Sequence, residues 1–351
     1  MSKIQKVYIR IKAGTASWKD FSTFLNLENK SLRKFFELAQ KNTIRNFGNI
    51  LKVYSPNKRF PAISITGDEC ALKCEHCNKK FLKGMKKILS DNDLERFLFE
   101  LYESGGIGAL ISGGSERNGS VPILGFLETI KKVKSETNLI INTHTGLLNE
   151  ETAEKLADAK VDIISFDINM DDKIVKEIYH LDVELEEYNK AVNLLKKYNL
   201  NIVPHICIGL YYGKLHKELD SIKFIKNSGI NPSLIVIIVL IPPKKGKVKF
   251  ATPRPVDVAK VIATTRFIFP KTEISLGCMR PRGKIKLEVE KYAIKAGITR
   301  IEIPSKKTLE WIKKIYPNIQ FKFFSACCAI PQKFEHYAES KKSDIKRYLY
   351  V

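Results

Sequence analysis

From residue 61 onward, apolar and polar positions alternate between two periods. Short apolar runs rich in β-branched residues predict strands. They lie at 61–66, 107–112, 138–143, 161–167, 201–208, 233–241, 272–277 and 298–303. Between them, apolar residues recur at helical spacing in stretches such as 91–103, 150–159, 184–198, 215–227, 255–267 and 284–296. The pattern therefore predicts a regular alternation of strands and helices.

Eight strands that are each followed by a helix predict an α/β fold, a (β/α)8 barrel of the TIM type, rather than an open sheet. Residues 234–240 are all apolar, which is typical of a parallel strand buried on both faces. Residues 18–46 show helical spacing before the barrel. We therefore expect a partly helical N-terminal extension (1–60), the barrel (61–304) and a C-terminal segment (305–351) that caps the barrel mouth.

The chain of 351 residues carries 60 Lys and Arg against 38 Asp and Glu, a net charge of +22. This excess predicts either an acidic partner or an adaptation of the whole proteome. No nucleic-acid recognition motif is visible, so we expect no nucleic-acid partner. The longest apolar run, 234–241, is far shorter than the ~20 residues of a membrane helix, and the N-terminus lacks the apolar stretch of a signal peptide. We therefore expect a soluble cytoplasmic protein with no membrane partner.

Three cysteines follow the first predicted strand with the spacing Cys-x3-Cys-x2-Cys: Cys70, Cys74 and Cys77. Three thiolates on one loop can hold three irons of a [4Fe-4S] cluster and leave the fourth iron open to a small chelating molecule. Zinc is the alternative, with His76 as a fourth ligand, but zinc prefers paired Cys-x2-Cys motifs and His76 cannot easily turn inward between two cysteines. Structural disulfides are disfavoured without a secretory signal. The spacing therefore favours an open cluster.

Polar residues also end the following predicted strands, where parallel barrels place their chemistry. Gly113 and Gly114 end the second strand, and their missing side chains allow a ligand to approach the backbone closely. His144 ends the third strand and Asn169 follows the fourth. Asp167 could accept both hydroxyls of a ribose, or could instead cap the next helix.

The fifth predicted strand places alternate residues on one face, so His205, Cys207 and Gly209 are expected to face the lumen. Beyond the cysteine loop, four cysteines remain, which are either small buried hydrophobes or ligands of an auxiliary iron–sulfur cluster. They are Cys207, Cys278, Cys327 and Cys328.

Cys327 and Cys328 follow the predicted barrel, so a C-terminal segment folded over the mouth would bring them to the cavity. Adjacent cysteines rarely share one cluster comfortably, so we expect only one of this pair to be a ligand. Arg280 and Arg282 lie beside Cys278 at a predicted strand end. We expect them to bind a carboxylate or a cluster sulfide, with a surface role as the alternative.

The cysteine loop resembles the signature loop of the radical S-adenosylmethionine (SAM) enzymes. In that family the open iron holds the amino and carboxylate groups of SAM, and an electron from the cluster breaks SAM to give a 5′-deoxyadenosyl radical. The family's glycine-rich segment, which holds the SAM amino group, resembles residues 111–116, and its adenine-contacting segment resembles residues 206–209. The resemblance implies that SAM is bound by Ser112, Gly113, Gly114, Ser115, His144, Asp167, Asn169, Ile208 and Gly209.

Five segments resemble the biotin synthase and lipoyl synthase branch of these enzymes, and most closely the archaeal-type lipoyl synthase that uses two related proteins. They are 111–116, 142–147, 203–210, 275–283 and 327–330. The branch implies insertion of sulfur at an unactivated carbon of an octanoyl chain on a lysine of a lipoyl carrier protein. The auxiliary cluster is the implied sulfur source. The implied partners are an acidic octanoylated carrier, a second lipoyl synthase protein and a reduced ferredoxin-type electron donor.

One departure from this branch concerns the auxiliary cluster. Bacterial lipoyl synthases carry an N-terminal cysteine triplet, whereas this chain has no cysteine before Cys70. The ligands must then come from the four later cysteines, with Ser325 or an arginine as a further candidate. That arrangement is nearer to biotin synthase, which inserts sulfur into free dethiobiotin.

Three alternatives therefore stay open. One is sulfur insertion of the biotin synthase type, which predicts a small-molecule pocket and no need for a carrier protein. A radical SAM enzyme that modifies RNA would explain the charge, but such enzymes usually add an RNA-binding domain for which the chain shows no spare length. A cluster carrier without catalysis would leave a full barrel with polar strand ends unexplained.

Overall fold

The computed structural model describes residues 1–28, 31–245, 248–341 and 343–345. Within these residues, eleven strands form one sheet in the order β11-β1-β10-β9-β8-β7-β6-β5-β4-β2-β3, and neighbouring strands are parallel throughout. The strands are β1 (Ile50–Tyr54), β2 (Ala62–Ser64), β3 (Lys86–Lys87), β4 (Gly108–Ser112), β5 (Ile140–His144), β6 (Ile163–Asp167), β7 (Ile202–Ile208), β8 (Leu234–Val239), β9 (Glu273–Leu276), β10 (Arg300–Glu302) and β11 (Gln320–Phe324).

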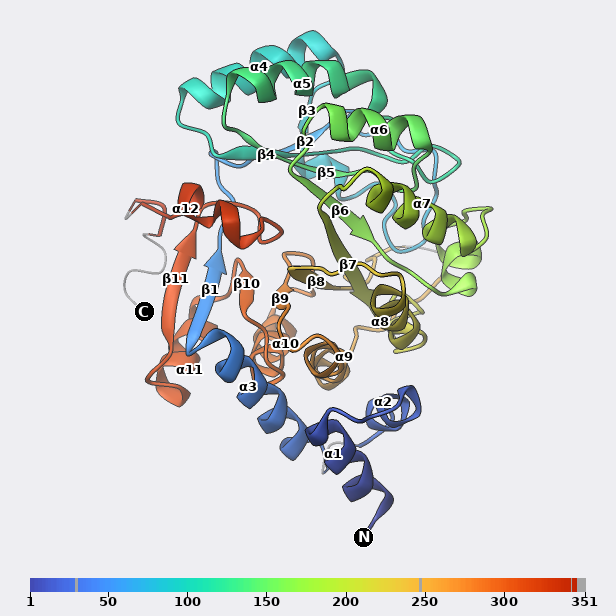
Figure 1. Ribbon diagram of the computed structural model, residues 1–351, viewed down its shortest axis with the longest axis vertical. Coiled ribbons are helices and arrows are strands. Elements are labelled where there is room, and N and C mark those ends of the chain that lie inside the picture. Colours follow the sequence, from blue (N-terminus) through green and yellow to red (C-terminus); the bar gives the residue numbers. More distant parts are fainter. Residues whose placement is uncertain (29–30, 246–247, 342, 346–351) are drawn as a thin grey trace.

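Most helices lie along the outer side of the curled sheet, whereas α12 (Glu335–Ala338) packs with the C-terminal segment against its inner side (Figure 1). The others are α1 (Lys3–Ala13), α2 (Trp18–Leu25), α3 (Arg33–Phe47), α4 (Asp91–Glu103), α5 (Leu127–Glu136), α6 (Glu150–Asp158), α7 (Glu186–Lys197), α8 (Glu218–Asn227), α9 (Pro255–Ile268), α10 (Lys284–Lys295) and α11 (Lys306–Ile315). A single π-helical turn spans Ile174–Ile178 after β6. Among the described residues, no helix is both long and apolar enough to cross a membrane.

The predicted α/β fold of the TIM type is confirmed, since each of the eight predicted strands is present in a curled parallel sheet with helices outside it. Closure differs from an ideal barrel, because in the described part of the chain the edge strands β3 and β11 do not pair with each other. The sheet also reaches beyond the predicted limits of 61–304: β1 belongs to the predicted N-terminal extension and β11 to the predicted cap. Both strands carry a lysine at their centre, Lys52 and Lys322, which hid them in the apolar pattern.

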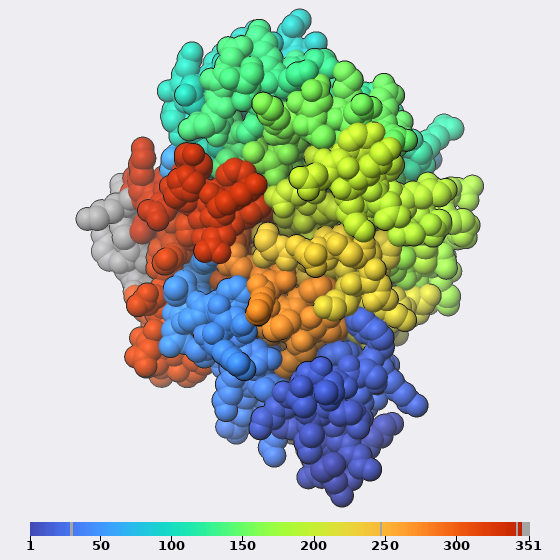
Figure 2. Space-filling view, in the orientation of Figure 1, coloured from blue at the N-terminus to red at the C-terminus, as the bar shows by residue number. Residues whose placement is uncertain are grey.

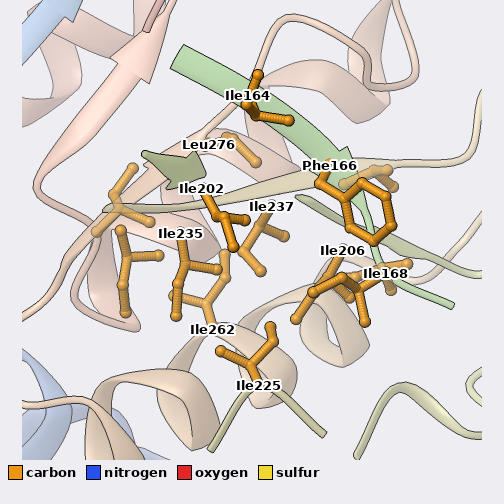
Figure 3. Close-up of a cluster of buried hydrophobic side chains, with 14 of the residues drawn as sticks. Ile164, Phe166, Ile168, Ile202, Ile206, Ile225, Ile235, Ile237, Ile262 and Leu276 are labelled. Carbon is orange, nitrogen blue, oxygen red and sulfur yellow. The ribbon is translucent and has the colours of Figure 1, made fainter. Parts of the chain in front are cut away.

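The outer face of the sheet is apolar and packs against the helices. Figure 3 shows isoleucines of β7 and β8, such as Ile202 and Ile235, on the side of the sheet where Ile262 of α9 and Ile225 of α8 lie. Complete burial of such a side chain contributes roughly 1.5–3 kcal/mol. Because successive side chains of a strand point to opposite faces, the residues between these buried ones must face the lumen.

The lumen holds a second apolar cluster, to which successive strands contribute inward residues, such as Ile140, Ile163 and Val203. The chain after β11 packs into this cluster through a buried segment that runs from Ala326 to Ile330. In Figure 2 the C-terminal segment, coloured red, fills the face between the green and blue parts of the surface. The segment after β11 therefore lies against the inner side of the sheet.

Candidate functional site

The cysteine loop leaves the C-terminal end of β2 and is held by its neighbours on both sides. The backbone N–H of Ser115 donates to the Sγ of Cys70 at 3.3 Å, and the Sγ of Cys74 lies 3.6 Å from the carbonyl oxygen of Tyr179. The Ala71 N–H donates to the Ser115 carbonyl at 2.7 Å. All three loop cysteines are free and partly buried. Burial, with the two neighbouring thiols, raises the pKa of Cys74 to about 12, so the ligand form of this thiol needs a bound cation.

The predicted glycine pair packs against this same loop. A Cβ on Gly114 would lie 1.9 Å from the carbonyl oxygen of Glu69 and 2.5 Å from the Cβ of Cys70. A Cβ on Gly113 would lie 2.9 Å from the Cγ2 of Thr66, whose hydroxyl accepts the Gly114 N–H at 2.7 Å. The close contact that requires glycine here is thus made with the protein's own chain and not with a ligand. It sets the segment 112–115 beside the cysteines, as a SAM site would need, while contact with SAM stays a prediction.

Polar side chains from β5, β6 and β7 meet at the rim of the lumen. The Nδ1 of His144 lies 3.6 Å from an Asp167 carboxylate oxygen, and the His144 and His205 rings are 5.1 Å apart. The Asp167 side chain is 58% exposed, and it does not cap the π-helical turn that follows. Partial desolvation acts to raise the pKa of Asp167, but His144 and its neighbours lower it overall. Asp167 is therefore an open, charged acceptor, as a ribose-binding role requires.

His205 is buried beneath this rim, with its Nδ1 2.9 Å from the carbonyl oxygen of Val203. Burial, aided by the charge of His144, lowers the pKa of His205 to about 4. His205 is therefore neutral at physiological pH.

A small cavity of about 20 Å³ lies next to the rim. Asp167, Asn169, His205 and Cys207 contribute to its lining. The Asn169 side-chain nitrogen is buried without a hydrogen-bond partner among the described residues, and such a group normally has one. The orphaned donor fits a site that receives a polar ligand. Cys207 belongs to this cavity, and burial raises its pKa well above the ordinary value.

Ile208 and Gly209 offer no side chain to the lumen. Ile208 is fully buried in the outer core, because it alternates with Cys207. Gly209 has φ +82° and packs against Pro253, and its N–H donates to Glu218 at 2.9 Å. The predicted adenine contact could be made here only by the backbone.

A second group of potential ligands gathers at the ends of β9, β10 and β11. Cys278 follows β9 and Glu302 ends β10, while Cys327 and Cys328 follow β11. Ligand atoms of Glu302, Cys327 and Cys328 all lie within 4.8 Å of one another. Cys278 is exposed as a residue, although desolvation of its thiol, with the nearby Glu302 and Cys327, raises its pKa. Two of the four predicted auxiliary ligands, Cys327 and Cys328, thus come together with Glu302, whereas the exposed Cys278 lies outside this compact group and Cys207 lines the separate cavity.

Sequence analysis missed Glu302 in this group. The available signal was the polar alternation of Arg300 and Glu302 within an otherwise apolar strand. In a barrel strand such alternation marks inward positions.

Arg280 packs beneath the group of Glu302, Cys327 and Cys328 and does not face the lumen. It is 2% exposed and pairs with the Glu290 carboxylate at 2.5 Å, and it also donates to the backbone carbonyl of Glu302 at 2.7 Å. Arg282 is exposed. The hydroxyl of Ser325 is within 2.9 Å of both Ser340 and Asp344. These contacts give Arg280 and Ser325 structural partners in place of the ligands expected from the sequence.

Comparison with known proteins agrees with this geometry. Residues 64–225 match the family model described as the radical SAM superfamily. The biotin synthase of Buchnera aphidicola subsp. Schizaphis graminum is 25% identical over 228 residues, which cover 62% of this chain and 64% of that protein. The biotin synthase of Buchnera aphidicola subsp. Acyrthosiphon pisum is 26% identical over 267 residues, which cover 72% of this chain and 74% of that protein. The chain thus spans less than two thirds of the length of the first relative.

Two solved structures share the fold at low sequence identity. The FeFe-hydrogenase maturase HydG from Carboxydothermus hydrogenoformans superposes with a TM-score of 0.69 at 16% identity, covering 99% of this chain and 85% of that one. Methylornithine synthase (PylB) superposes with a TM-score of 0.60 at 15% identity, covering 97% and 95%. The chain is thus similar to the radical SAM superfamily over residues 64–225 and to biotin synthases over 62–72% of its length, and the two solved structures share its fold.

Proposed function

We propose that this protein is a sulfur-inserting radical SAM enzyme of the lipoyl synthase type. Its substrate would be an octanoyl chain carried as an amide on a lysine of a lipoyl carrier protein. The observation that carries the proposal is the pair of cysteine groups, one after β2 and one after β9 and β11. Because all strands are parallel, both groups lie at the same rim of the sheet. Radical cleavage of SAM needs only the first cysteine group, so the second cysteine group implies a further role.

Different residues of the rim would bind the cluster and SAM. Cys70, Cys74 and Cys77 would hold a [4Fe-4S] cluster, which with SAM supplies the radical chemistry when bound. The Ser115 N–H already donates to the Cys70 sulfur, which stabilises negative charge there. Asp167 would accept hydroxyls of the SAM ribose. His205, neutral and buried beneath it, would add no competing positive charge.

The second cysteine group would supply the sulfur. Cys278, Cys327 and Cys328 are proposed to hold an auxiliary iron–sulfur centre, and Cys207 is left out because it lines the separate cavity. The Cys327–Cys328 turn packs against the apolar inner cluster that includes Ala326 and Ile330. This packing buries Cys328 away from water, as a carbon radical beside a sulfur donor requires.

The charge of the chain supports a macromolecular substrate. Carrier domains of this type tend to be acidic, and a net charge of +22 would steer an acidic domain to the rim. The second candidate is sulfur insertion into dethiobiotin, which the similarity to biotin synthases favours.

A comparison of the two substrates tests the proposal. The reconstituted, reduced protein is supplied anaerobically with SAM and either an octanoyl-lysyl peptide or dethiobiotin, and products are measured by mass spectrometry. Sulfur in the octanoyl peptide but not in dethiobiotin supports the lipoyl type. This holds whether the protein is assayed by itself or with the second protein of the pair added. Sulfur in dethiobiotin alone would replace it with the second candidate.

A further inference from the structure

Glu302 is a buried acidic group in an unusual setting. It ends β10, is 3% exposed, and its side chain meets the thiol of Cys328. Among the described residues Glu302 forms no ion pair, and its contact with Arg280 is made through its backbone carbonyl. A buried acid of this kind is kept either as the neutral, protonated acid or as a carboxylate beside a cation. A bound metal ion would neutralise it.

The spacing of the ligand atoms indicates how many metal ions this site holds. The carboxylate of Glu302 and the sulfurs of Cys327 and Cys328 all lie within 4.8 Å of one another. Two sulfurs bound to one tetrahedral ion at about 2.3 Å are ~3.8 Å apart. The three atoms are therefore close enough to share one ion. Among the described residues Cys70, Cys74 and Cys77 form no group this compact, as expected for thiolates that each bind a different iron of a cube.

The neighbouring chain holds these ligands in place before any metal binds. Arg300 donates to the carbonyl oxygens of Cys328 at 3.2 Å and Ile330 at 2.5 Å, which fixes the Cys327–Cys328 turn. Arg280 donates to the Glu302 carbonyl and fixes the end of β10. Ligands positioned by such supporting hydrogen bonds are typical of built metal sites.

We propose that Glu302, Cys327 and Cys328 bind one divalent transition-metal ion of the ferrous or zinc type, with Glu302 as an oxygen ligand. Cys278, which follows β9, is a candidate for a fourth position outside this compact group. Binding replaces the protons of both thiols, which pass to the solvent. Only the assignment of this ion as one iron of the sulfur-donating centre rests on the proposed function. Metal binding itself depends on neither SAM nor substrate.

Cobalt(II) is a suitable probe, because its thiolate charge-transfer band counts bound sulfurs and its visible bands report tetrahedral geometry. The metal is titrated anaerobically into the full-length, cluster-free chain with Cys70, Cys74 and Cys77 changed to Ser. We expect one cobalt per chain, displaced by zinc. Cys327→Ser or Cys328→Ser should remove a third to a half of the charge-transfer band, depending on whether Cys278 also binds.

The carboxylate is tested by Glu302→Gln, which should keep the thiolate band at saturation but weaken cobalt binding by at least about tenfold. Glu302→Asp retains a carboxylate and should bind more tightly than Glu302→Gln. Cys207→Ser is the matched control and should leave the titration unchanged. Absence of a stoichiometric cobalt band, or equal affinity in the parent and Glu302→Gln proteins, would overturn the proposal. If Glu302→Gln does not fold, as judged by circular dichroism, the Cys327 and Cys328 variants decide. Since no SAM is present, failure of sulfur insertion leaves these results unaffected.

Discussion

Gly114 is the residue whose identity most tightly constrains the cysteine loop. Its position admits no side chain, because the Glu69 carbonyl and the Cys70 Cβ occupy the space of a Cβ atom. Gly114 therefore acts through contact with the loop, independently of any ligand.

Gly114→Ala is expected to push the cysteine loop away from β4 and to destabilise the protein by about 1–3 kcal/mol, the usual cost of overpacking. Iron bound after anaerobic reconstitution of the first cluster should fall by more than half. Gly125→Ala is the control, because a Cβ there meets no atom within 4 Å. Equal iron content in the two variants would contradict this role for Gly114.

His205 predicts a pH dependence of stability. Its folded pKa of about 4 lies below the unfolded value of about 6.5, so the unfolded chain binds more protons between these values and stability falls as the pH drops through this window. At pH 5 the loss is about 2 kcal/mol relative to pH 8. Urea unfolding at both pH values should show a smaller loss in His205→Gln. The exposed His336 is the control, and His336→Gln should behave like the parent protein.

At the scale of elements, the strands with apolar runs could be predicted from the sequence, and the two that carry a central lysine could not. Lys52 of β1 points into the lumen and pairs with Glu273 of β9 and Glu335 of α12, each at 2.8 Å. Its partners are distant in the sequence, so local hydropathy reads the segment as polar. The cysteine loop could be predicted because its spacing is local. Glu302 could not, because only the fold brings it to Cys327 and Cys328.

The Arg300 guanidinium joins β10 to β9 through Glu273, and to the C-terminal segment through Glu335 and two backbone carbonyls. Arg300→Met should cost about 3–5 kcal/mol, because it leaves buried carboxylates without their main cation. Denaturant unfolding measures this loss. The exposed pair of Arg33 and Glu37 provides the control, since Arg33→Met should cost less than about 1 kcal/mol. Similar losses in both variants would show that the network does not anchor the segment.

For the whole molecule, the excess of 22 positive charges predicts how it meets an acidic carrier. Salt screens such long-range attraction beyond about 10 Å at 0.1 M. The kcat/KM for an octanoylated carrier domain should fall several-fold between 50 and 500 mM salt, mainly through association. The value for a short, uncharged octanoyl-lysyl peptide should change little. A parallel decline for both substrates would assign the charge to general surface solvation.

The central claim is that the two cysteine groups perform two different tasks, cleavage of SAM and supply of sulfur. The most direct measurement quantifies 5′-deoxyadenosine and thiolated octanoyl peptide in parallel, for the reduced parent protein and for the Cys74→Ala and Cys328→Ala variants. We predict that Cys74→Ala forms neither product, and that Cys328→Ala forms 5′-deoxyadenosine but little or no sulfur product. Cleavage of SAM by Cys74→Ala at the parent rate would contradict the account.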